Sequence, residues 1–283
     1  MKKWEVKARL FVILRREDAE GPPCRNKGVL RFAQDDGSED HDFVSFVHAR
    51  RVAALSWPLY LGGLSVVIGS SLVMAFTSNA FLGWGAALAI FVALWFMTAS
   101  FLAFHAMFDS SDLLRGTWLP QLFAAPPKRW VQITTSLDQT RLPLESLFPD
   151  AEGRVIDVYD PRSTTEPALA RARRDVATQS GSRISDVGDG WAELVLIMLS
   201  AHEIRDPKER DRLFHEVARA LAPEGRVVLV EHLRDLAAVL AFGPGAWHFF
   251  PRKTWLEHFA SSRFVIQHEF PITPFVRVFE LKV

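Results

Sequence analysis

Polar side chains follow two apolar runs in the C-terminal half of the sequence. The segment 200–203, which reads SAHE, comes directly after the run 194–199, and the dipeptide Glu231-His232 comes directly after the run 227–230. Imidazoles and carboxylates are the groups that proteins use to move protons and to bind metal ions. These two clusters are therefore the residues whose types most clearly suggest chemistry.

Proton transfer is the chemistry that we favour for these clusters. A histidine with a pKa of about 6.5 suits the removal of a proton from an attacking hydroxyl or amine. His202 is our candidate base, with Glu203 and His232 as further catalytic candidates, and a purely structural hydrogen-bonding role for both histidines is the alternative. With Glu231 and His248 the set would also suit zinc or iron(II), but its spacing is not that of an HExxH helix, so we expect no metal site.

The elements that position the two clusters form a strand–helix–strand unit. Between the apolar runs lies a charged segment, about 208–221, with apolar side chains at helical spacing, and Pro223-Glu224-Gly225 ends it. Two buried strands joined by such a helix make a right-handed unit with parallel strands, covered by helices on both faces. Ligands bind outside the carboxyl ends of such strands, so we expect both clusters on one rim of an α/β sheet.

The same region resembles the second half of the class I S-adenosylmethionine-dependent methyltransferases. The stretch 219–226 reads RALAPEGR, similar to the family pattern RxLxPGG with glutamate at the first glycine. The segments AHEIRD (201–206), EHLRD (231–235), FGPGAWHFFPR (242–252) and ITPF (272–275) are most similar to a bacterial, membrane-anchored branch of methyltransferase-like proteins. Over about 128–283, the resemblance implies a Rossmann-like sheet, S-adenosyl-L-methionine as cofactor and methyl transfer as the activity.

The resemblance also implies a donor-binding turn after the first strand of this domain, about 130–134. In the family that turn is rich in glycine, which lets the backbone approach the donor, whereas here it reads TTSLDQT. The small hydroxyl residues Thr135 and Ser136 could still permit the approach, and Asp138 could hold the ammonium group of the donor. Ser200 is the expected donor contact from the neighbouring strand.

A second donor contact is implied at the end of the next strand, about 155–160. There the family has an acidic residue that accepts hydrogen bonds from both ribose hydroxyls, because a carboxylate is a bidentate acceptor. Asp160 is terminal in the predicted strand, and Asp157 is the alternative if the register differs.

An uncharged stretch precedes the domain. No Asp, Glu, Lys or Arg occurs from 52 to 108, which is long enough for two spanning helices of about 20 residues each. Thr77-Ser78-Asn79 supplies the break, so we expect helices at about 53–76 and 80–107 within a transmembrane hairpin, 51–108. Arg50 and Arg51 lie before the hairpin, further basic residues follow it, and the turn has none, which places both ends in the cytoplasm.

The remaining segments complete the domain organisation. We expect 1–50 to be a poorly ordered N-terminal extension, because charges interrupt any signal-peptide core, 109–127 to be a linker, and 128–283 to be the methyltransferase-like domain. The single cysteine, Cys24, excludes an internal disulfide. Basic and acidic residues number 33 each, so no overall basic field favours nucleic acid as a partner.

These patterns predict a methyltransferase anchored in the bacterial inner membrane by two helices, with its globular domain in the cytoplasm. The acceptor would be a small molecule or a lipid, and catalysis would consist mainly of positioning the reacting groups and excluding water. The alternative is a non-catalytic binding or scaffold protein at the membrane that retains the fold. The glycine-free turn favours that alternative, and the polar rim disfavours it.

Overall fold

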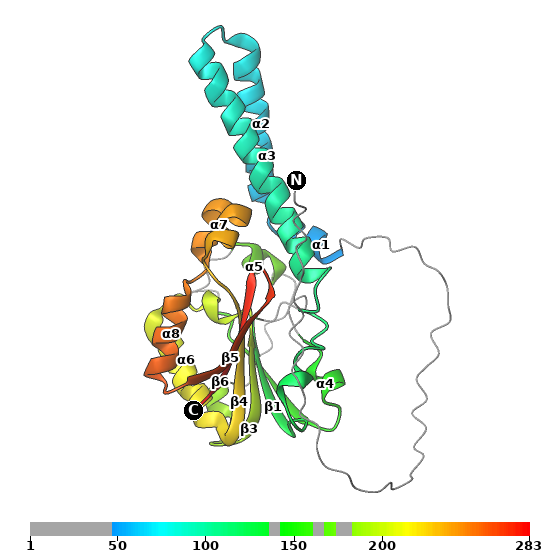
Figure 1. The fold of residues 1–283 in the computed structure, drawn as a ribbon, viewed down its shortest axis with the longest axis vertical. Helices are drawn as coiled ribbons and strands as arrows, with labels where there is room; N and C mark the ends of the chain where they lie inside the picture. Colours follow the sequence, from blue (N-terminus) through cyan, green and yellow to red (C-terminus); the bar gives the residue numbers. More distant parts are fainter. Residues whose placement is uncertain (1–46, 136–141, 161–166, 174–182) are drawn as a thin grey trace, which may run out of the picture. The chain divides into compact units, whose positions relative to one another are not determined.

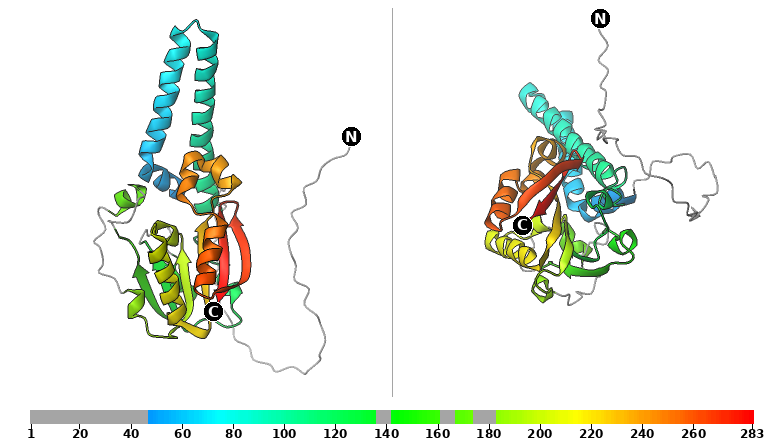
Figure 2. Two further views of the ribbon diagram at one scale, coloured as in Figure 1. Left: turned by 90° about the vertical axis from the view of Figure 1, so that its left-hand side faces the viewer. Right: turned by 60° about the horizontal axis from the view of Figure 1, so that its bottom comes forward.

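The structure is a computed structural model that describes residues 47–135, 142–160, 167–173 and 183–283. Two long apolar helices come first, α2 (Trp57–Phe76) and α3 (Ala80–Phe108), packed side by side (Figures 1 and 2). The break between them is at the predicted place, where Asn79 accepts hydrogen bonds from the backbone N–H groups of Phe81 and Leu82 and so caps α3. By length and composition both helices could span a membrane.

The predicted first helix is divided in two. The short helix α1 (Val47–Leu55) ends at Ser56, and α2 begins with Pro58 in its first turn. Proline fits only the first turn of a helix, because it has no N–H to donate and its ring crowds the preceding turn. Most side chains of α2 are exposed, including Phe76 at 87%, whereas α3 is exposed near its start, as at Phe81 with 85%, and buried at its end.

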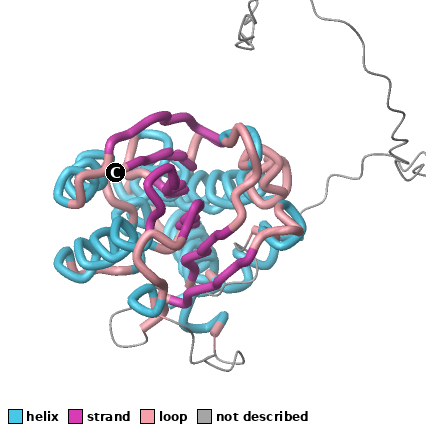
Figure 3. Tube along the Cα trace, turned by 90° about the horizontal axis from the view of Figure 1, so that it is seen from below, coloured by secondary structure: helices cyan, strands magenta, loops and turns pink. Residues whose placement is uncertain are grey.

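A six-stranded sheet follows in the order β2-β1-β3-β4-β6-β5 (Figure 1). Its strands are β1 (Arg129–Thr134), β2 (Glu152–Asp157), β3 (Ala192–Met198), β4 (Leu221–His232), β5 (Val265–Thr273) and β6 (Val276–Lys282). Strands β1 to β4 are parallel, whereas β6 is antiparallel to both β4 and β5, and Figure 3 shows the strands together as one band. The parallel unit predicted from the two apolar runs is confirmed.

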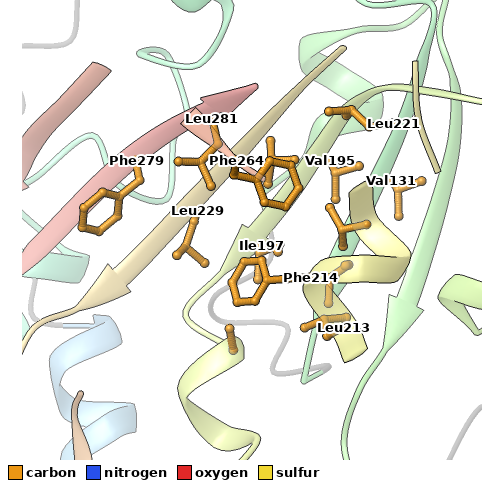
Figure 4. Close-up of a cluster of buried hydrophobic side chains, with 14 of the residues drawn as sticks. Val131, Val195, Ile197, Leu213, Phe214, Leu221, Leu229, Phe264, Phe279 and Leu281 are labelled. Atoms are coloured by element: carbon orange, nitrogen blue, oxygen red, sulfur yellow. The ribbon is translucent and has the colours of Figure 1, made fainter. Parts of the chain in front are cut away.

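One face of the sheet is covered by α6 (Pro207–Ala220) and α8 (Arg252–Ser261), which pack against each other (Figure 1). The apolar face of α6 places Leu213 and Phe214 over Val195 and Ile197 of β3, as Figure 4 shows. Asp206 caps α6 by accepting the N–H of Lys208. This helix connects β3 to β4, which pair in parallel, so the carboxyl ends of both strands lie at the same edge of the sheet.

The opposite face is covered by the end of α3 and by the segment that follows it. Met107, Leu113 and Leu119 are fully buried with Trp130 of β1 in a second apolar cluster. The stretch expected to be a linker is thus part of the core of the domain. The hairpin and the sheet are consequently joined by packed side chains rather than by a free tether.

Short elements occupy the connections. They are the helices α4 (Leu144–Leu147), α5 (Pro167–Ala172) and α7 (Leu236–Phe242), and the 3-10 turns η1 (Pro120–Leu122), η2 (Ile184–Asp186), η3 (Ala201–Glu203) and η4 (Gly243–His248). Of these, η3 and η4 carry side chains of the candidate site, and α7 packs against α3.

Candidate active site

The two polar clusters predicted from the sequence lie together at the carboxyl ends of β3 and β4. These strands pair in parallel up to Met198 and Val230. Leu199 then takes a positive φ of 47°, a strained conformation for a residue with a side chain, and starts a sharp turn into η3. The Nδ1 atom of His202 consequently lies 2.6 Å from Oε2 of Glu231.

Glu231 holds this turn in place from the end of β4. Its side chain is fully buried, and its Oε1 accepts the backbone N–H groups of Ala201 at 2.8 Å and His202 at 3.2 Å. Since an ionised carboxylate can only accept, Nδ1 of His202 donates to it, which fixes the orientation of the imidazole ring. Sequence reasoning placed Glu231 in the cluster but did not assign it this central role.

A third imidazole reaches the same place from η4. His248 Nε2 lies 3.2 Å from Oε1 of Glu203, and His202 Nε2 lies 3.4 Å from the same oxygen. Arg205 joins the two turns, because its guanidinium donates to the backbone oxygens of His202 at 3.1 Å and His248 at 2.7 Å. The sequence placed His248 in a candidate set with Glu203, but their separation of 45 residues did not predict this direct contact.

Charge pairing decides the protonation states of the rim. Burial would lower the pKa of His202, but the charges of Glu231 and Glu203 outweigh it and raise that pKa to about 10. Burial would raise the pKa of Glu203, yet hydrogen bonds from His202 and His248 hold it at about 2. His202 is then protonated at neutral pH, so in this pairing it is not available as the general base that we expected.

His232 is the neutral imidazole of the rim. Burial, followed by the nearby charge of His202, lowers the pKa of His232 to about 4. Its Nδ1 lies 3.0 Å from the backbone oxygen of Phe275 and must donate to it, which leaves Nε2 as an acceptor. Within the predicted catalytic set, His232 is therefore the group whose protonation state permits it to accept a proton.

A cavity of about 440 Å³ connects the rim with the base of the hairpin. Its polar lining includes Thr135, His202, Glu203, His232 and His248. Apolar side chains from α1, α2, α3 and the region of α7 and η4 form most of the rest: Val52, Leu55, Leu59, Ala93, Phe96, Met97, Phe104, Phe108, Phe242 and Phe249. Residues of η4, including Pro244 and His248, also line this cavity.

The structure changes which aspartate is the candidate for binding the ribose. Strand β2 ends at Asp157, which lies opposite Thr134, so Asp157 and not Asp160 is the strand-terminal carboxylate. The prediction that the strand runs to Asp160 is wrong because the backbone leaves the sheet once the N–H of Tyr159 donates to Asp157 Oδ1 at 2.9 Å. Asp160 lies beyond the strand and is exposed.

Arg173 binds the same carboxylate. Its Nη2 lies 2.6 Å from Asp157 Oδ2, its Nη1 donates to the backbone oxygen of Thr135, and its guanidinium stacks 4.1 Å from the ring centre of Tyr159. Arg173 thereby ties the ends of β1 and β2 together. The sequence did not predict this role, because it depends on two strand ends that only the fold brings to Arg173.

The order of the strands identifies the fold. Four parallel strands run β2-β1-β3-β4, and a reversed pair, β6 and β5, is added at the β4 edge, as the sequence resemblance implied. The fold is an open, Rossmann-like α/β sheet with the strand order that the resemblance implied. The Rossmann-like fold class predicted from the sequence is confirmed.

Comparisons with known proteins find only distant likenesses. No family model and no curated protein matches the sequence. Among solved structures, a putative type 11 methyltransferase from Sulfolobus solfataricus is 20% identical, with 59% of this chain and 90% of that chain covered and a TM-score of 0.42. A SAM-dependent methyltransferase from Aquifex aeolicus is 11% identical, with 60% and 90% covered and a TM-score of 0.44. The mitomycin 7-O-methyltransferase MmcR is 15% identical, with 84% and 72% covered and a TM-score of 0.40.

The resemblance of the sequence to the methyltransferases implies a methyl donor over the carboxyl ends of β1 and β2. Thr135 is there and lines the cavity, and Asp157 is the terminal acid. A carboxylate has about four acceptor positions, so Asp157 can still accept ribose hydroxyls beside its bonds from Tyr159 and Arg173. These residues are compatible with S-adenosylmethionine.

One other predicted donor contact differs, and two lie outside the described residues. Ser200 is fully buried, and its hydroxyl donates to the backbone oxygen of Ile133 at 3.2 Å. It therefore ties β3 to β1 instead of facing the cavity, so its expected donor contact is not supported. Ser136 and Asp138 fall in the part of the chain that the structure does not describe.

Proposed function

We propose that this chain is a membrane-anchored methyltransferase that uses S-adenosyl-L-methionine and methylates an amphiphilic acceptor, a lipid or another small molecule with an apolar body. The observation that carries the proposal is the single cavity at the rim. Thr135, at the donor end of the fold, and His202, at the end of β3, line that cavity together with residues of the hairpin. One space thus joins the place for a donor, a set of polar groups and an apolar wall.

The chemistry of the wall selects the class of acceptor. A volume of about 440 Å³ is within the range of small-molecule pockets, roughly 300–1,000 Å³. A wholly polar metabolite would lose its hydration against aliphatic and aromatic side chains without gaining hydrogen bonds there, which is unfavourable. An acceptor with an apolar body along α2 and α3 and a polar head at the histidines matches both ends of the cavity.

The hairpin supports a membrane source for the acceptor. If α2 and α3 cross the bilayer, the cavity lies at their base, where Trp57 is 53% exposed in the interfacial position typical of tryptophan. An acceptor could then enter from the bilayer without passing through water. The basic residues on either side of the hairpin favour a cytoplasmic domain at the bacterial inner membrane.

The residues of the site would contribute mainly by positioning. The bound donor supplies an electrophilic methyl group for a direct displacement. Thr135 and Asp157 would hold the donor, the apolar wall would exclude water, and Glu203 and the rim histidines would orient the acceptor head. Bringing two reactants together in the right geometry is itself a large part of catalysis for such reactions.

Transfer of a radiolabelled methyl group tests this proposal. The full chain in lipid nanodiscs would be incubated with labelled S-adenosylmethionine and a bacterial lipid extract, and the label followed into the organic phase. Ala93→Phe would fill the cavity from α3 and should reduce transfer at least tenfold with donor affinity unchanged, because it obstructs only the acceptor. Thr98→Phe, on the same helix but exposed and outside the cavity lining, is the matched control.

Three outcomes separate the possibilities. Label in the organic phase that depends on position 93 supports an amphiphilic acceptor. Label found only in water-soluble products overturns the acceptor class while keeping the reaction. Absence of donor binding favours the second candidate function, a scaffold at the membrane. The contact of Arg173 with Asp157 also supports that function, because it occupies part of the carboxylate that a donor would use.

A further inference from the structure

We propose that His202, Glu203 and His248 form a binding site for one divalent transition-metal ion of the zinc class. One ligand atom from each side chain lies within 4.8 Å of the others. Two imidazoles and one carboxylate suit zinc and its first-row neighbours. The sequence spacing, which is not that of an HExxH helix, argued against a metal, and only the folded chain brings the three groups together.

The distances match a tetrahedral ion. Zinc binds histidine nitrogen and carboxylate oxygen at about 2.0–2.2 Å, so ligand atoms at the corners of its tetrahedron lie roughly 3.3–3.5 Å apart. Oε1 of Glu203 is 3.4 Å from His202 Nε2 and 3.2 Å from His248 Nε2. A small movement of the His248 turn would complete the third edge.

Glu203 itself points to a missing partner. Its side chain is only 8% exposed, and its second oxygen, Oε2, has no hydrogen-bond partner among the described residues. Leaving a buried acceptor unpaired costs about 1–3 kcal/mol, and more for a charged group, so such atoms are rare. A cation beside the carboxylate would remove this cost.

The partner of His202 is the one expected around a bound metal. Histidine ligands usually donate their second ring nitrogen to a carboxylate, which fixes the ring and makes the ligating nitrogen more basic. Glu231 is in that position, 2.6 Å from Nδ1, and is itself held by two backbone N–H groups. The ligating nitrogen, Nε2, is thereby directed by the fold.

The ion would have an open position. Three protein ligands leave a fourth place on a tetrahedral ion, which is the arrangement of catalytic rather than structural zinc sites. The three ligands line the apolar cavity, so a water or an acceptor oxygen could occupy that place. A metal-bound hydroxyl loses its proton more readily, because the ion stabilises the resulting anion.

Imidazole N–H groups that donate to Glu203 would hold the same three groups together without a metal, so proximity alone does not decide between the two arrangements. Metal content does. The full chain would be purified in detergent without a polyhistidine tag, stripped with chelator, and equilibrated with micromolar zinc. We expect one zinc per chain, and with cobalt(II) the visible absorption of a tetrahedral site.

Variants make the test specific. His248→Asn, in a turn at the edge of the cavity, and Glu203→Gln should lower bound zinc to background. Glu231→Gln should weaken binding about 10–100-fold, the effect of losing an outer partner. His215→Asn removes an exposed imidazole on α6 and should leave zinc binding unchanged.

Folding is checked for every variant by circular dichroism. Failure of the folded, unmodified chain to bind micromolar zinc would overturn the metal site, as would binding that survives both His248→Asn and Glu203→Gln. Donor binding is measured separately and does not depend on the ion, so failure of the metal site and failure of the proposed function can be told apart.

Discussion

Arg173 lies 2.6 Å from the carboxylate of Asp157, and this pair closes the carboxyl ends of β1 and β2. The arginine side chain is 4% exposed and the aspartate side chain 11% exposed. The acid that the fold type would use to hold a donor therefore already balances a buried positive charge. Donor binding and the stability of this edge of the sheet depend on the same residue.

Loss of that charge should destabilise the domain. Asp157→Asn leaves Arg173 without its anion, and removing one member of a buried pair is strongly unfavourable, so we expect about 2–3 kcal/mol less free energy of unfolding. Asp160→Asn, three residues on and exposed, should stay within about 0.5 kcal/mol. Chemical denaturation of the two variants, monitored by tryptophan fluorescence, compares them, and equal effects would show that the pair is unimportant.

Tight packing beneath the sheet predicts a second effect. A methyl group at Gly153 would overlap the indole of Trp130, which is buried in the second apolar cluster. Gly153→Ala should therefore destabilise the domain by about 1–3 kcal/mol, as overpacked cores do. Gly188 is exposed, and a Cβ added there would lie 4.0 Å from its nearest neighbour, so Gly188→Ala should be tolerated. Thermal unfolding of both variants measures the difference, and a stable Gly153→Ala would mean that Trp130 can move.

Asp109 anchors α1 and supplies a pH-dependent prediction. Its two oxygens accept the backbone N–H groups of His48 at 2.9 Å and Ala49 at 3.1 Å, so a residue after α3 caps the start of α1. Burial would raise the pKa of Asp109, but these bonds and those from the side chains of His48 and His105 lower it below its ordinary value of 3.8. The stabilisation is thus complete above that ordinary value and is lost as the pH falls through the lowered pKa.

Asp109→Asn should loosen α1 at neutral pH by about 1–2 kcal/mol. Trypsin cleavage at the exposed residues Arg50 and Arg51 should then be faster by roughly tenfold, the factor that corresponds to about 1.4 kcal/mol. Asp112→Asn, at a side chain 58% exposed, is the control and should not change cleavage. The stability difference between the unmodified chain and Asp109→Asn should shrink in acid, and a constant difference would rule out the carboxylate as its source.

The elements of this fold were largely predictable because their apolar patterns are strong. The runs in β3 and β4 and the face of α6 with Leu213 and Phe214 carry the periodicity of a parallel unit. The boundaries of the elements were less predictable. Pro58 divided the first predicted helix, and the predicted break at 223–225 lies within β4. There Gly225 lies so close to the backbone oxygen of Ala192 that an added Cβ would be 2.8 Å from it.

The site was only partly predictable for a related reason. Residues at or just beyond the end of a strand, such as Glu231 and His202, are placed by the sheet and could be located from the sequence. His248 and Arg173 come from turns whose positions depend on tertiary contacts. The protonation of His202 likewise depends on two carboxylates that only the fold assembles.

The orientation of the hairpin can be tested with reporters. A reporter active only in the cytoplasm should be active when fused after Val283, and one active only outside should be active when inserted at the turn 77–79. This follows from basic residues on both sides of the hairpin and none in its turn. Activity of the cytoplasmic reporter at the turn would reverse the topology or remove the hairpin from the membrane.

Binding of the methyl donor tests the central claim most directly. Titration calorimetry on the full chain in detergent should detect one S-adenosylhomocysteine per chain at submillimolar affinity. Asp157→Asn should weaken that binding by about 1.5–3 kcal/mol, the scale of a lost charge-assisted hydrogen bond, and by more than Asp160→Asn does. A folded, unmodified chain that binds neither this product nor S-adenosylmethionine at millimolar concentration would contradict the methyltransferase account.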